Sequence, residues 1–367
     1  MEFKKPENNI IISDKEIRAN RPEPIISSLD LIPYNRQDNP NTAVEALVDG
    51  YYVLILGDFS SGLKILDALK KYVKTKYPNQ SFQGQRDFRS AFRKLSHQLL
   101  VVINKHRINL KKSPEIEWLK ILYPEFDEFL LAFPQVQGLN SSWQWYKKGI
   151  DIPVLNKKIH PYFGTYFPTR FEHLVLFDDW LKQYEGNKES AIDIGIGCGV
   201  LSFQMLKHGF KHIYGTDSNP NAIIGLNNEQ NKNTLYSKIE LFYGDLFADC
   251  SSSTELIVFN PPWLPASHDL DGIDMAIYYD NELFPRFFSE AKKHLKAGGR
   301  VVLLFSNLAQ ITGLSNKHPI ETELASGGRF KKELLLQEKI ASASKKTRRN
   351  QNWRLDEMVE LWVLKLE

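Results

Sequence analysis

Two polar segments, about sixty residues apart, each follow a short apolar run, and this pattern constrains the fold more than any other feature of the chain. The first segment, residues 193–199, reads DIGIGCG, and the second, residues 260–263, reads NPPW. A short apolar run that ends in a polar turn is typical of a buried strand. In open parallel sheets, ligands bind at the carboxyl ends of the strands. The pattern therefore predicts two strands of one sheet whose ends share a ligand site.

Strand and helix patterns alternate from about residue 162 to the end of the sequence. We expect strands over 191–194, 212–216, 239–243, 256–259 and 300–305, and helices over 200–208 and 284–295. Two final apolar segments, 334–341 and 359–366, are typical of an antiparallel pair. The alternation predicts an α/β, Rossmann-like fold with a seven-stranded, mostly parallel sheet and a last antiparallel strand.

The first 150 residues have a different pattern. Residues 1–40 are polar and contain several Pro and Asn residues, which predicts an irregular lead-in. Over 41–150, apolar side chains recur at helical steps, as in the sets Leu66, Leu69, Val73 and Phe88, Phe92, Leu95, Leu99, Val102. Residues 51–56 fit either a strand or a buried helix. We expect a mostly helical N-terminal domain over 41–150 and a second domain over 160–367.

The composition is that of a globular protein, with 42% apolar and 25% charged residues. No apolar run approaches the roughly 18 residues that a membrane span needs. The first residues lack the pattern of a secretory signal, so we expect a soluble, cytoplasmic protein. Two cysteines cannot build a disulfide framework or a cysteine-rich zinc site.

Basic residues are concentrated in one part of the N-terminal region. Between Ser61 and Lys112 there are 13 Lys and Arg residues against two acids, Asp67 and Asp87, a local charge of 13 − 2 = +11. The remaining residues therefore carry 3 − 11 = −8. Such asymmetry can mark a surface for nucleic acid or for an acidic protein. The alternative is that these side chains are the solvated faces of amphipathic helices.

The glycine-rich segment has the spacing G-x-G-x-G at Gly195, Gly197 and Gly199. A dinucleotide fingerprint needs its third glycine where this chain has Val200, and the Gly-Lys-Ser/Thr ending of a P-loop is absent. Glycines without side chains let the backbone approach a small ligand closely. The segment therefore predicts a ligand-binding turn that differs from the nicotinamide-binding and P-loop turns.

An acidic residue stands at the end of each of three successive expected strands. Asp193 is placed to meet a positively charged amino group, and Asp217 suits two ribose hydroxyls. Asp245 could accept a hydrogen bond from the exocyclic amine of adenine. Three acids in this arrangement predict a nucleoside ligand more specifically than the glycines do alone.

The NPPW segment suits a planar amide or amine nitrogen as its ligand. The lone pair of an amide or of an exocyclic amine is delocalised, so that nitrogen is a poor nucleophile. The side-chain oxygen of Asn260 and the carbonyl of Pro261 can accept its N–H groups and favour a pyramidal nitrogen. Pro261 and Pro262 stiffen the turn. Trp263 can stack on the planar acceptor, a contact worth roughly 1–3 kcal/mol for a base.

Four motifs in this order resemble the class I S-adenosylmethionine-dependent methyltransferases. They are DIGIGCG, the TDSNP run from Thr216, GDLF from Gly244, and FNPPW. The chain is most similar to the amino-methyltransferase subset with an Asn-Pro-Pro-aromatic motif, which includes release-factor glutamine methyltransferases and adenine methyltransferases of DNA and RNA. The run from His160 to Arg170 resembles the stretch that precedes the core in bacterial members and packs over the cofactor. Trp263 departs from the Tyr or Phe that is commoner in this subset.

The resemblance implies an enzyme that uses S-adenosyl-L-methionine as methyl donor without a metal. It implies a macromolecular substrate, either nucleic acid or a protein of translation. Catalytic roles would fall to Asn260, Pro261, Pro262 and Trp263. The cofactor would be bound by a larger set of residues: Phe167, Thr169, Asp193, Gly195, Gly197, Gly199, Asp217, Ser218, Asp245, Leu246 and Asn260.

Several alternatives stay open on sequence alone. One is a non-catalytic RNA- or ribosome-binding module with this fold, and another is a small-molecule N-methyltransferase. A nicotinamide-dependent oxidoreductase is disfavoured by Val200. We interpret residues 268–274, with one His and three Asp, as a loop beside the site rather than a metal site. The basic run 345–349 either grips phosphate or is a solvated hairpin tip.

Three histidines and the first cysteine are expected to have structural roles. The histidines lie near the ends of expected helices: His208, His212 and His294. Cys198 stands inside the glycine-rich turn, where a small side chain fits.

Overall fold

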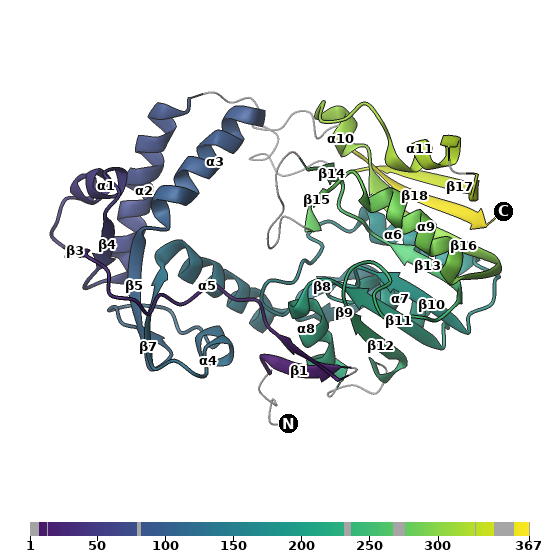
Figure 1. The fold of residues 1–367 in the computed structure, drawn as a ribbon, viewed down its shortest axis with the longest axis horizontal. Coiled ribbons are helices and arrows are strands. Elements are labelled where there is room, and N and C mark those ends of the chain that lie inside the picture. Colours follow the sequence, from purple (N-terminus) through teal and green to yellow (C-terminus); the bar gives the residue numbers. More distant parts are fainter. Residues whose placement is uncertain are drawn as a thin grey trace. The chain divides into compact units, whose positions relative to one another are not determined.

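A computed structural model describes residues 7–12, 14–78, 82–230, 236–266, 276–326, 328–340 and 356–366 (Figure 1). The chain forms two compact units. We call residues 21–147 the N-terminal unit, and residues 7–20 together with 148–366 the C-terminal unit. The predicted motifs all lie in the C-terminal unit.

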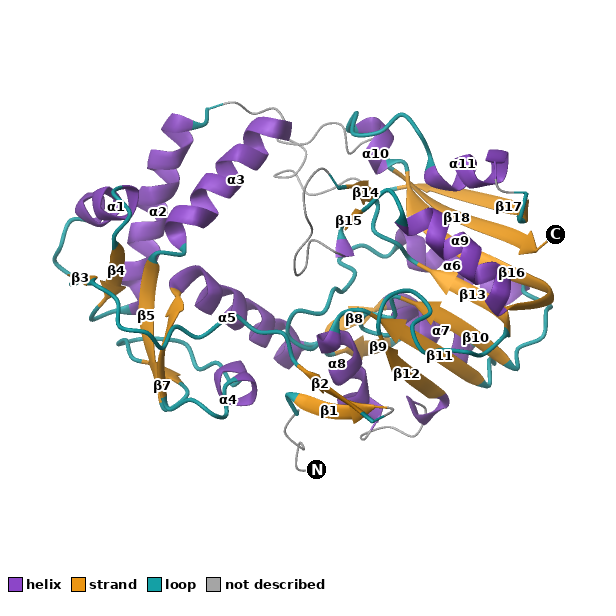
Figure 2. Ribbon diagram, in the orientation of Figure 1, coloured by secondary structure: helices purple, strands orange, loops and turns teal. Residues whose placement is uncertain are grey.

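A seven-stranded sheet forms the centre of the C-terminal unit, with helices on both faces (Figure 2). The strand order is β12-β11-β10-β13-β16-β18-β17. The strands are β10 (Ser190–Ile194), β11 (His212–Asp217), β12 (Ile239–Tyr243), β13 (Thr254–Phe259), β16 (Leu295–Ser306), β17 (Phe330–Lys339) and β18 (Met358–Leu366). The main helices are α6 (Glu172–Gln183), α7 (Val200–Lys207), α8 (Pro220–Gln230), α9 (Leu283–His294), α10 (Leu308–Ile311) and α11 (Pro319–Ser326).

The direction of the strands agrees with the sequence-based expectation. β10 pairs in parallel with β11 on one side and with β13 on the other, while β18 runs antiparallel between β16 and β17. The predicted seven-stranded sheet with a final antiparallel strand is therefore confirmed. Because the chain order reverses between β10 and β13, the topological switch point falls where both predicted motifs begin.

Alternate residues of the central strands face opposite helix layers. Ile192 and Ile194 of β10 join a buried apolar cluster with Phe287 and Phe288 of α9. Between them, Asp193 faces the other layer, where it meets Ser202 of α7. Burial of large apolar side chains on both faces explains why these strands read as nearly continuous apolar runs.

Two short strands near the start of the chain correct the expected irregular lead-in. β1 (Asn9–Ile12) and β2 (Lys15–Arg18) form an antiparallel hairpin that packs on α8. Ile10 and Ile17 are buried, at 7% and 2% exposure. Their burial is the physical reason for the hairpin, because an apolar run in a polar segment gains free energy when it covers a neighbouring helix.

Small two-stranded ladders and short turns complete the C-terminal unit. β8 (Ile150–Ile152) pairs with β9 (Lys157–Ile159), and β14 (Leu264–Pro265) pairs with β15 (Tyr278–Tyr279). One 3₁₀ turn, Pro153–Leu155, connects β8 and β9, and another, Tyr236–Lys238, precedes β12.

The N-terminal unit contains a sheet as well as the expected helices. Its helices are α1 (Pro40–Val48), α2 (Phe59–Lys76), α3 (Phe82–Ser96), α4 (Trp118–Leu122) and α5 (Phe133–Lys148). Its strands are β3 (Leu31–Tyr34), β4 (Tyr52–Ile55), β5 (Leu99–Asn104), β6 (Arg107–Ile108) and β7 (Glu128–Ala132). β3, β4 and β5 are parallel neighbours, and β6 and β7 pair antiparallel with β5. Residues 51–56, left open by the sequence, thus contain a strand.

The predicted helix face that continued to Leu99 and Val102 is wrong beyond Ser96. The helix ends there, and both residues lie in β5. A run of five apolar residues such as LLVVI, with three β-branched members, pairs well inside a sheet. Spacing alone could not separate this strand from a buried helix.

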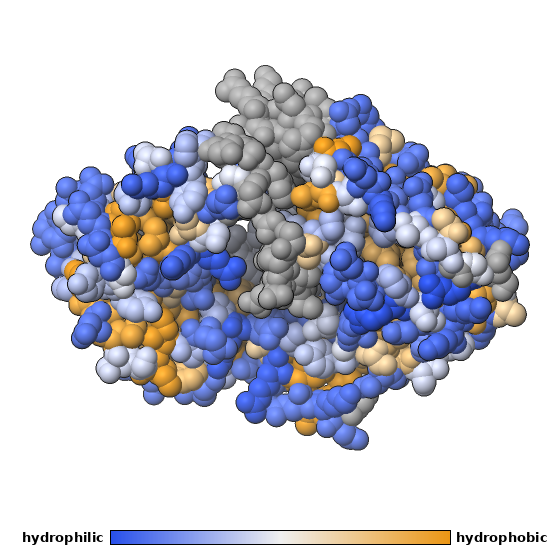
Figure 3. Space-filling view, turned by 45° about the horizontal axis from the view of Figure 1, so that its top comes forward, coloured by the Kyte–Doolittle hydropathy of each residue, from blue (hydrophilic) through white to orange (hydrophobic). Residues whose placement is uncertain are grey.

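On the face turned toward the viewer in Figure 3, hydrophobic side chains form separate patches that hydrophilic side chains surround. Within the described residues, no helix is both long and apolar enough to cross a membrane.

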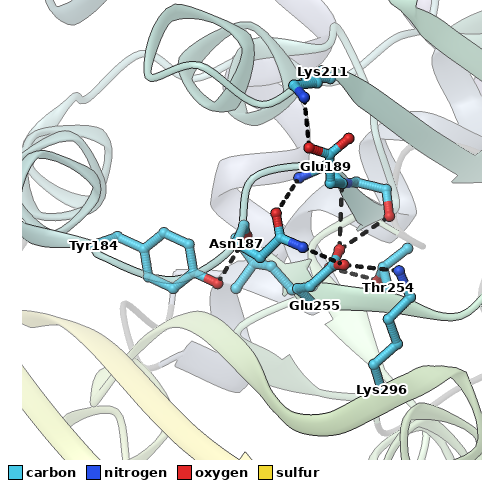
Figure 4. A network of polar contacts seen from close by, with 9 residues as sticks. Tyr184, Asn187, Glu189, Lys211, Thr254, Glu255 and Lys296 are labelled. Carbon is cyan, nitrogen blue, oxygen red and sulfur yellow. Dashed lines mark hydrogen bonds and ion pairs between the residues drawn. The ribbon is translucent and has the colours of Figure 1, made fainter.

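A polar network holds the amino ends of the central strands together (Figure 4). Glu255 near the start of β13 accepts hydrogen bonds from the backbone N–H and hydroxyl of Ser190, the first residue of β10, at 3.3 and 3.2 Å. Its other oxygen accepts from Asn187 Nδ2 at 3.2 Å and from Lys296 Nζ at 2.7 Å. Burial opposes ionisation, but the hydrogen bonds, led by Lys296, outweigh it and lower the pKa of Glu255.

We expect Glu255→Gln to lower the free energy of unfolding by about 1–2 kcal/mol, because a charge-assisted hydrogen bond at a largely buried oxygen is weakened. Urea denaturation at neutral pH measures this change. Since the folded pKa is depressed, the wild-type advantage should shrink as pH falls through that pKa.

Glu189→Gln is the matched control, because the Glu189–Lys211 pair is exposed at 55% and 68%. Its effect should stay within about 0.5 kcal/mol. Equal effects of the two substitutions would contradict the role given to Glu255.

Candidate active site

The glycine-rich turn leaves the carboxyl end of β10 and leads into α7. Gly195, Gly197 and Gly199 all have positive φ, at 63°, 53° and 79°. These backbone conformations are rare for residues with a side chain. A Cβ atom on Gly199 would also lie 2.8 Å from the side chain of Leu226. The spacing of the glycines is therefore required by the backbone of the turn and by its packing on α8.

Asp193 lies directly before this turn and is 1% exposed. Its Oδ2 accepts a hydrogen bond from the hydroxyl of Ser202 at 2.6 Å. Its Oδ1 is buried and has no hydrogen-bond partner among the described residues. Burial raises the pKa of Asp193 to about 7, although the hydrogen bond from Ser202 opposes the shift. One carboxylate oxygen is thus available for a positively charged partner.

Asp217 ends the neighbouring strand β11 and binds the glycine turn. Its carboxylate accepts the backbone N–H of Gly197 and that of Asn219, both at 2.8 Å. Burial raises its pKa to about 6, and the two backbone hydrogen bonds oppose that shift. The next residue, Ser218, is exposed. The structure therefore brings two of the predicted acids to adjacent strand ends.

The third acid, Asp245, follows β12 and is more exposed than the other two. The backbone N–H of Gly244 donates to the carbonyl of Asp217 at 3.0 Å, which joins the two strand ends. The carboxylate of Asp245 forms an ion pair with Arg286 of α9. Leu246 has a positive φ of 47°, an uncommon conformation for a leucine, and is buried. Backbone strain of this kind often accompanies a functional turn.

The segment before the core packs against the same strand ends. Asn219 Nδ2 donates to the carbonyl of Gly164 at 2.9 Å, and Asn221 Nδ2 donates to that of Phe163 at 2.7 Å. Arg170 binds Glu357 at 3.1 Å. Within this segment, Phe167 is half-buried and Thr169 is exposed.

A cavity lies between this segment and the glycine turn. Tyr162, Thr165, Gly197 and Cys198 are among the residues that line it. The hydroxyl of Thr165 is buried and has no hydrogen-bond partner among the described residues. Burial raises the pKa of the Cys198 thiol to about 12, which agrees with a structural rather than a reactive cysteine.

The NPPW segment begins at the carboxyl end of β13, next to the glycine turn. Ile194 of β10 is paired with Phe259 of β13, so Gly195 and Asn260 each stand one residue beyond paired positions. The indole N–H of Trp263 donates to Asn260 Oδ1 at 3.2 Å and to the carbonyl of Leu304 at 3.3 Å. Asn260, Pro262 and Trp263 are half-buried, whereas Pro261 is buried. The two predicted motifs therefore meet at one edge of the sheet.

Sequence reasoning missed His173. This residue of α6 is 4% exposed, and its ring lies 5.7 Å from that of Trp263 at an interplanar angle of 88°. Burial lowers the pKa of His173 to about 4, so the ring is neutral at pH 7. A single histidine on an amphipathic helix gives no sequence signal for such a position.

Other candidates divide into structural residues and residues outside the described ranges. His208 contacts Asp178 at 2.8 Å, His212 contacts Glu240 at 3.2 Å, and His294 contacts the carbonyl of Ser252 at 2.9 Å. These contacts support the structural roles expected for the three histidines. The loop 268–274 and the basic run 345–349 lie outside the described residues.

The fold and this edge of the sheet define a class I methyltransferase. The methyltransferase small domain family matches residues 176–316. A protein of Methanocaldococcus jannaschii, provisionally named a protein N5-glutamine methyltransferase, is 31% identical over 166 residues, which cover 43% of this chain and 80% of that protein. The chain belongs to this family of S-adenosylmethionine-dependent methyltransferases and is an enzyme of that class.

Two other relatives match over shorter lengths than the Methanocaldococcus jannaschii protein does. A ribosomal protein L11 methyltransferase of Haemophilus influenzae is 30% identical over 141 residues, 36% of this chain and 42% of that protein. Ribosomal RNA small subunit methyltransferase C of Alcanivorax borkumensis is 30% identical over 122 residues, 33% of each chain. A crystal structure of an L11 methylase from Lactobacillus delbrueckii is 19% identical, with a TM-score of 0.37, over 56% of this chain and 83% of that one. This chain thus spans less than half the length of the two 30%-identical relatives.

The residues at this edge fit the methyl donor of the family, S-adenosylmethionine. Within the described ranges, Asp193 Oδ1 and the Thr165 hydroxyl have no hydrogen-bond partner; the first is suited to an ammonium group, and the second lies in the adjoining cavity. Buried polar atoms without partners are rare in proteins, so their occurrence beside the glycine turn supports a polar ligand there.

We expect Asp193→Asn to change how the stability of the ligand-free protein depends on pH. The folded pKa of Asp193 is about 7, against a reference value of 3.8. The folded state therefore holds this proton more tightly, and that stabilisation is lost as pH rises from about 4 to about 7. The free energy of unfolding of the wild type, minus that of the variant, should fall by more than about 1 kcal/mol between about pH 5 and pH 8.

Urea denaturation of both proteins at the two pH values measures this difference. Asp217 and His173 titrate in both proteins, so their contributions largely cancel in the subtraction. A difference that stays constant with pH would show that Asp193 has an ordinary pKa.

Proposed function

We propose that this enzyme transfers a methyl group to a planar amino or amide nitrogen of a macromolecule. The observation that carries the proposal is the position of Asn260 beside the glycine turn, at the switch point of the sheet. An amide oxygen at this position can bind an acceptor N–H next to the methyl donor.

The acceptor nitrogen would be oriented by two oxygen atoms of the NPPW segment. Asn260 Oδ1 and the Pro261 carbonyl accept its N–H hydrogens, which reduces delocalisation of the lone pair and favours a tetrahedral nitrogen. Pro262 keeps the turn stiff, and Trp263 offers a ring face for a planar acceptor. Placement of the nitrogen in line with the methyl group would then supply most of the rate acceleration.

When bound, S-adenosylmethionine would supply a methyl group activated by its sulfonium, S-adenosylhomocysteine would be the product that leaves, and the methylated nitrogen would release one proton to water. Asp193 would pair with a cationic amino group and Asp217 with ribose hydroxyls. The Asp245 carboxylate would accept a hydrogen bond from the adenine amine, and its ion pair with Arg286 would weaken to allow this. The glycine turn, Phe167, Thr169, Ser218 and Leu246 would complete the binding site.

A macromolecular acceptor is supported by the names of the relatives, which act on proteins or on ribosomal RNA. The N-terminal unit adds an observation that favours nucleic acid. α2 and α3 pack on each other and carry exposed cations with no acidic partner among the described residues: Lys64, Lys70, Lys74, Lys76, Arg89, Arg93 and Lys94.

Two aromatic rings lie among these cations. Phe88 and Phe92 of α3 are half-buried and stacked, with centroids 6.1 Å apart and an interplanar angle of 6°. Of the basic residues on α2, Lys71 is neutralised by Asp67 at 2.8 Å. Unpaired cations beside aromatic rings are the combination that binds a phosphate backbone with exposed bases.

We expect Asn260→Ala to lower methyl transfer by about 10²–10³-fold, as for loss of one preorganised polar group at a reacting centre. The assay uses labelled S-adenosylmethionine and cell extract, with nuclease or protease treatment of the product. Asn260 is one of eleven residues expected to bind the cofactor, so binding of S-adenosylhomocysteine, measured by calorimetry, should weaken far less than turnover, and its retention shows that the variant is folded. Labelling that persists in Asn260→Ala would refute the role of Asn260, and label only in small molecules would refute a macromolecular acceptor.

We expect charge reversal on α2 to weaken binding to RNA. The affinity for a fluorescein-labelled RNA oligonucleotide decreases as salt rises, and this dependence should be weaker in Lys70→Glu/Lys74→Glu. The magnitude of the slope of log affinity against log salt should be smaller by about 2, because each cation lost removes about one phosphate contact. Fluorescence anisotropy at several salt concentrations measures the slope.

Lys238→Glu/Lys292→Glu is the matched control, since both lysines are exposed in the C-terminal unit. An equal loss in the two double variants would show only a non-specific charge effect. Equal binding of polyglutamate and RNA by the wild type would point to an acidic protein partner and overturn the preference for nucleic acid.

A further inference from the structure

Trp263 makes a polar contact that a phenylalanine at this position could not make. Its indole N–H is directed at two acceptors, Asn260 Oδ1 at 3.2 Å and the carbonyl of Leu304 at 3.3 Å. A phenylalanine would keep the ring face but would lack the N–H. The N–H is therefore the group on which this contact depends.

The contact determines which edge of the Asn260 amide faces Trp263. An indole N–H is only a donor, whereas the asparagine amide has an acceptor edge and a donor edge. The reversed amide would place its NH₂ group against the indole N–H, without a hydrogen bond. The N–H of Trp263 therefore fixes the position of Oδ1, and one lone pair of that oxygen remains for an acceptor N–H.

The position of Trp263 is itself restrained on several sides. The backbone after it is held by Leu264, whose N–H donates to the carbonyl of Ile277 at 3.1 Å, and by Ala266, whose N–H donates to that of Tyr279 at 2.7 Å. The buried ring of His173 lies nearly perpendicular to the indole, with centroids 5.7 Å apart. A neutral imidazole at this distance restrains the indole plane by packing.

We propose that Trp263 and His173 are positioning residues: the indole N–H holds the Asn260 oxygen where the acceptor nitrogen binds, and the imidazole fixes the indole. The proposal rests on the proposed function, because it assigns these residues to the orientation of the same nitrogen. It predicts that loss of the N–H affects turnover, while loss of the ring also affects acceptor binding.

The test compares Trp263→Phe with Trp263→Leu in steady-state kinetics. The substrate is unmethylated acceptor, taken from the fraction of the cell extract that the wild-type enzyme labels. Trp263→Phe keeps a ring and removes the N–H, so kcat should fall at least about tenfold with little change in KM, as expected for a misplaced reacting group. Trp263→Leu should also raise KM. Trp145→Phe, an exposed tryptophan of α5, is the matched control and should keep the wild-type kcat.

A readout without turnover tests the contact itself. NMR spectroscopy detects the indole N–H signals of the seven tryptophans of the chain. The signal of Trp263 is identified by its loss in Trp263→Phe. Asn260→Ala should shift this signal, and His173→Ala should broaden or shift it more than His173→Phe. His173→Ala should also lower kcat, with recovery in His173→Phe.

Two results would overturn the proposal. One is a kcat in Trp263→Phe within about twofold of the wild type, and the other is an indole signal that does not respond to Asn260→Ala. If the wild-type enzyme labels no macromolecule, the proposed function fails instead. The NMR measurement then still decides whether Trp263 holds Asn260.

Discussion

The pairing of Ile194 with Phe259 is the constraint on which the site depends. In parallel neighbours, this register places the next residues, Gly195 and Asn260, at the same edge of the sheet. No side chain has to reach across the fold, because the backbone hydrogen bonds of two buried strands set the separation. Register is strongly specified when both faces of a strand are buried, as they are for β10 and β13.

The electrostatics of this edge follow from the same arrangement. Strands that end together bring Asp193 and Asp217 near each other, and burial raises the pKa of both. Among the described residues, their hydrogen-bond partners are neutral donors: the hydroxyl of Ser202 and the backbone N–H groups of Gly197 and Asn219. A site of buried acids with neutral partners favours a cationic or hydroxyl-rich ligand, since such a ligand supplies the interactions that water no longer provides.

Much of the C-terminal unit could be predicted, because its strands are apolar runs that stop at polar motifs. The expected strand 239–243 coincides with β12, and the expected helix 200–208 differs from α7 by one residue. The sheet of the N-terminal unit was missed because Leu99 and Val102 continue the helical spacing of Phe88, Phe92 and Leu95. The hairpin turn at Lys105 and His106 has positive φ at both residues without a Gly or Asn to indicate it.

Residues of the site that come from distant elements could not be predicted. His173 reaches Trp263 only through the packing of α6, about ninety residues earlier in the chain. The direction of the indole N–H depends on the carbonyl of Leu304, whose position is set by β16. Such contacts depend on how distant elements pack in three dimensions. Residue types and their spacing along the chain do not give this packing.

The place of β18 in the sheet has a consequence for biosynthesis. This strand lies between β16 and β17, although it follows both in the chain. Until residues 358–366 have left the ribosome, β16 and β17 each present an open edge toward the gap between them. A nascent or truncated chain without these residues would therefore expose two unpaired strand edges, which are templates for aggregation, and the sheet can close only after residues 358–366 are available to pair.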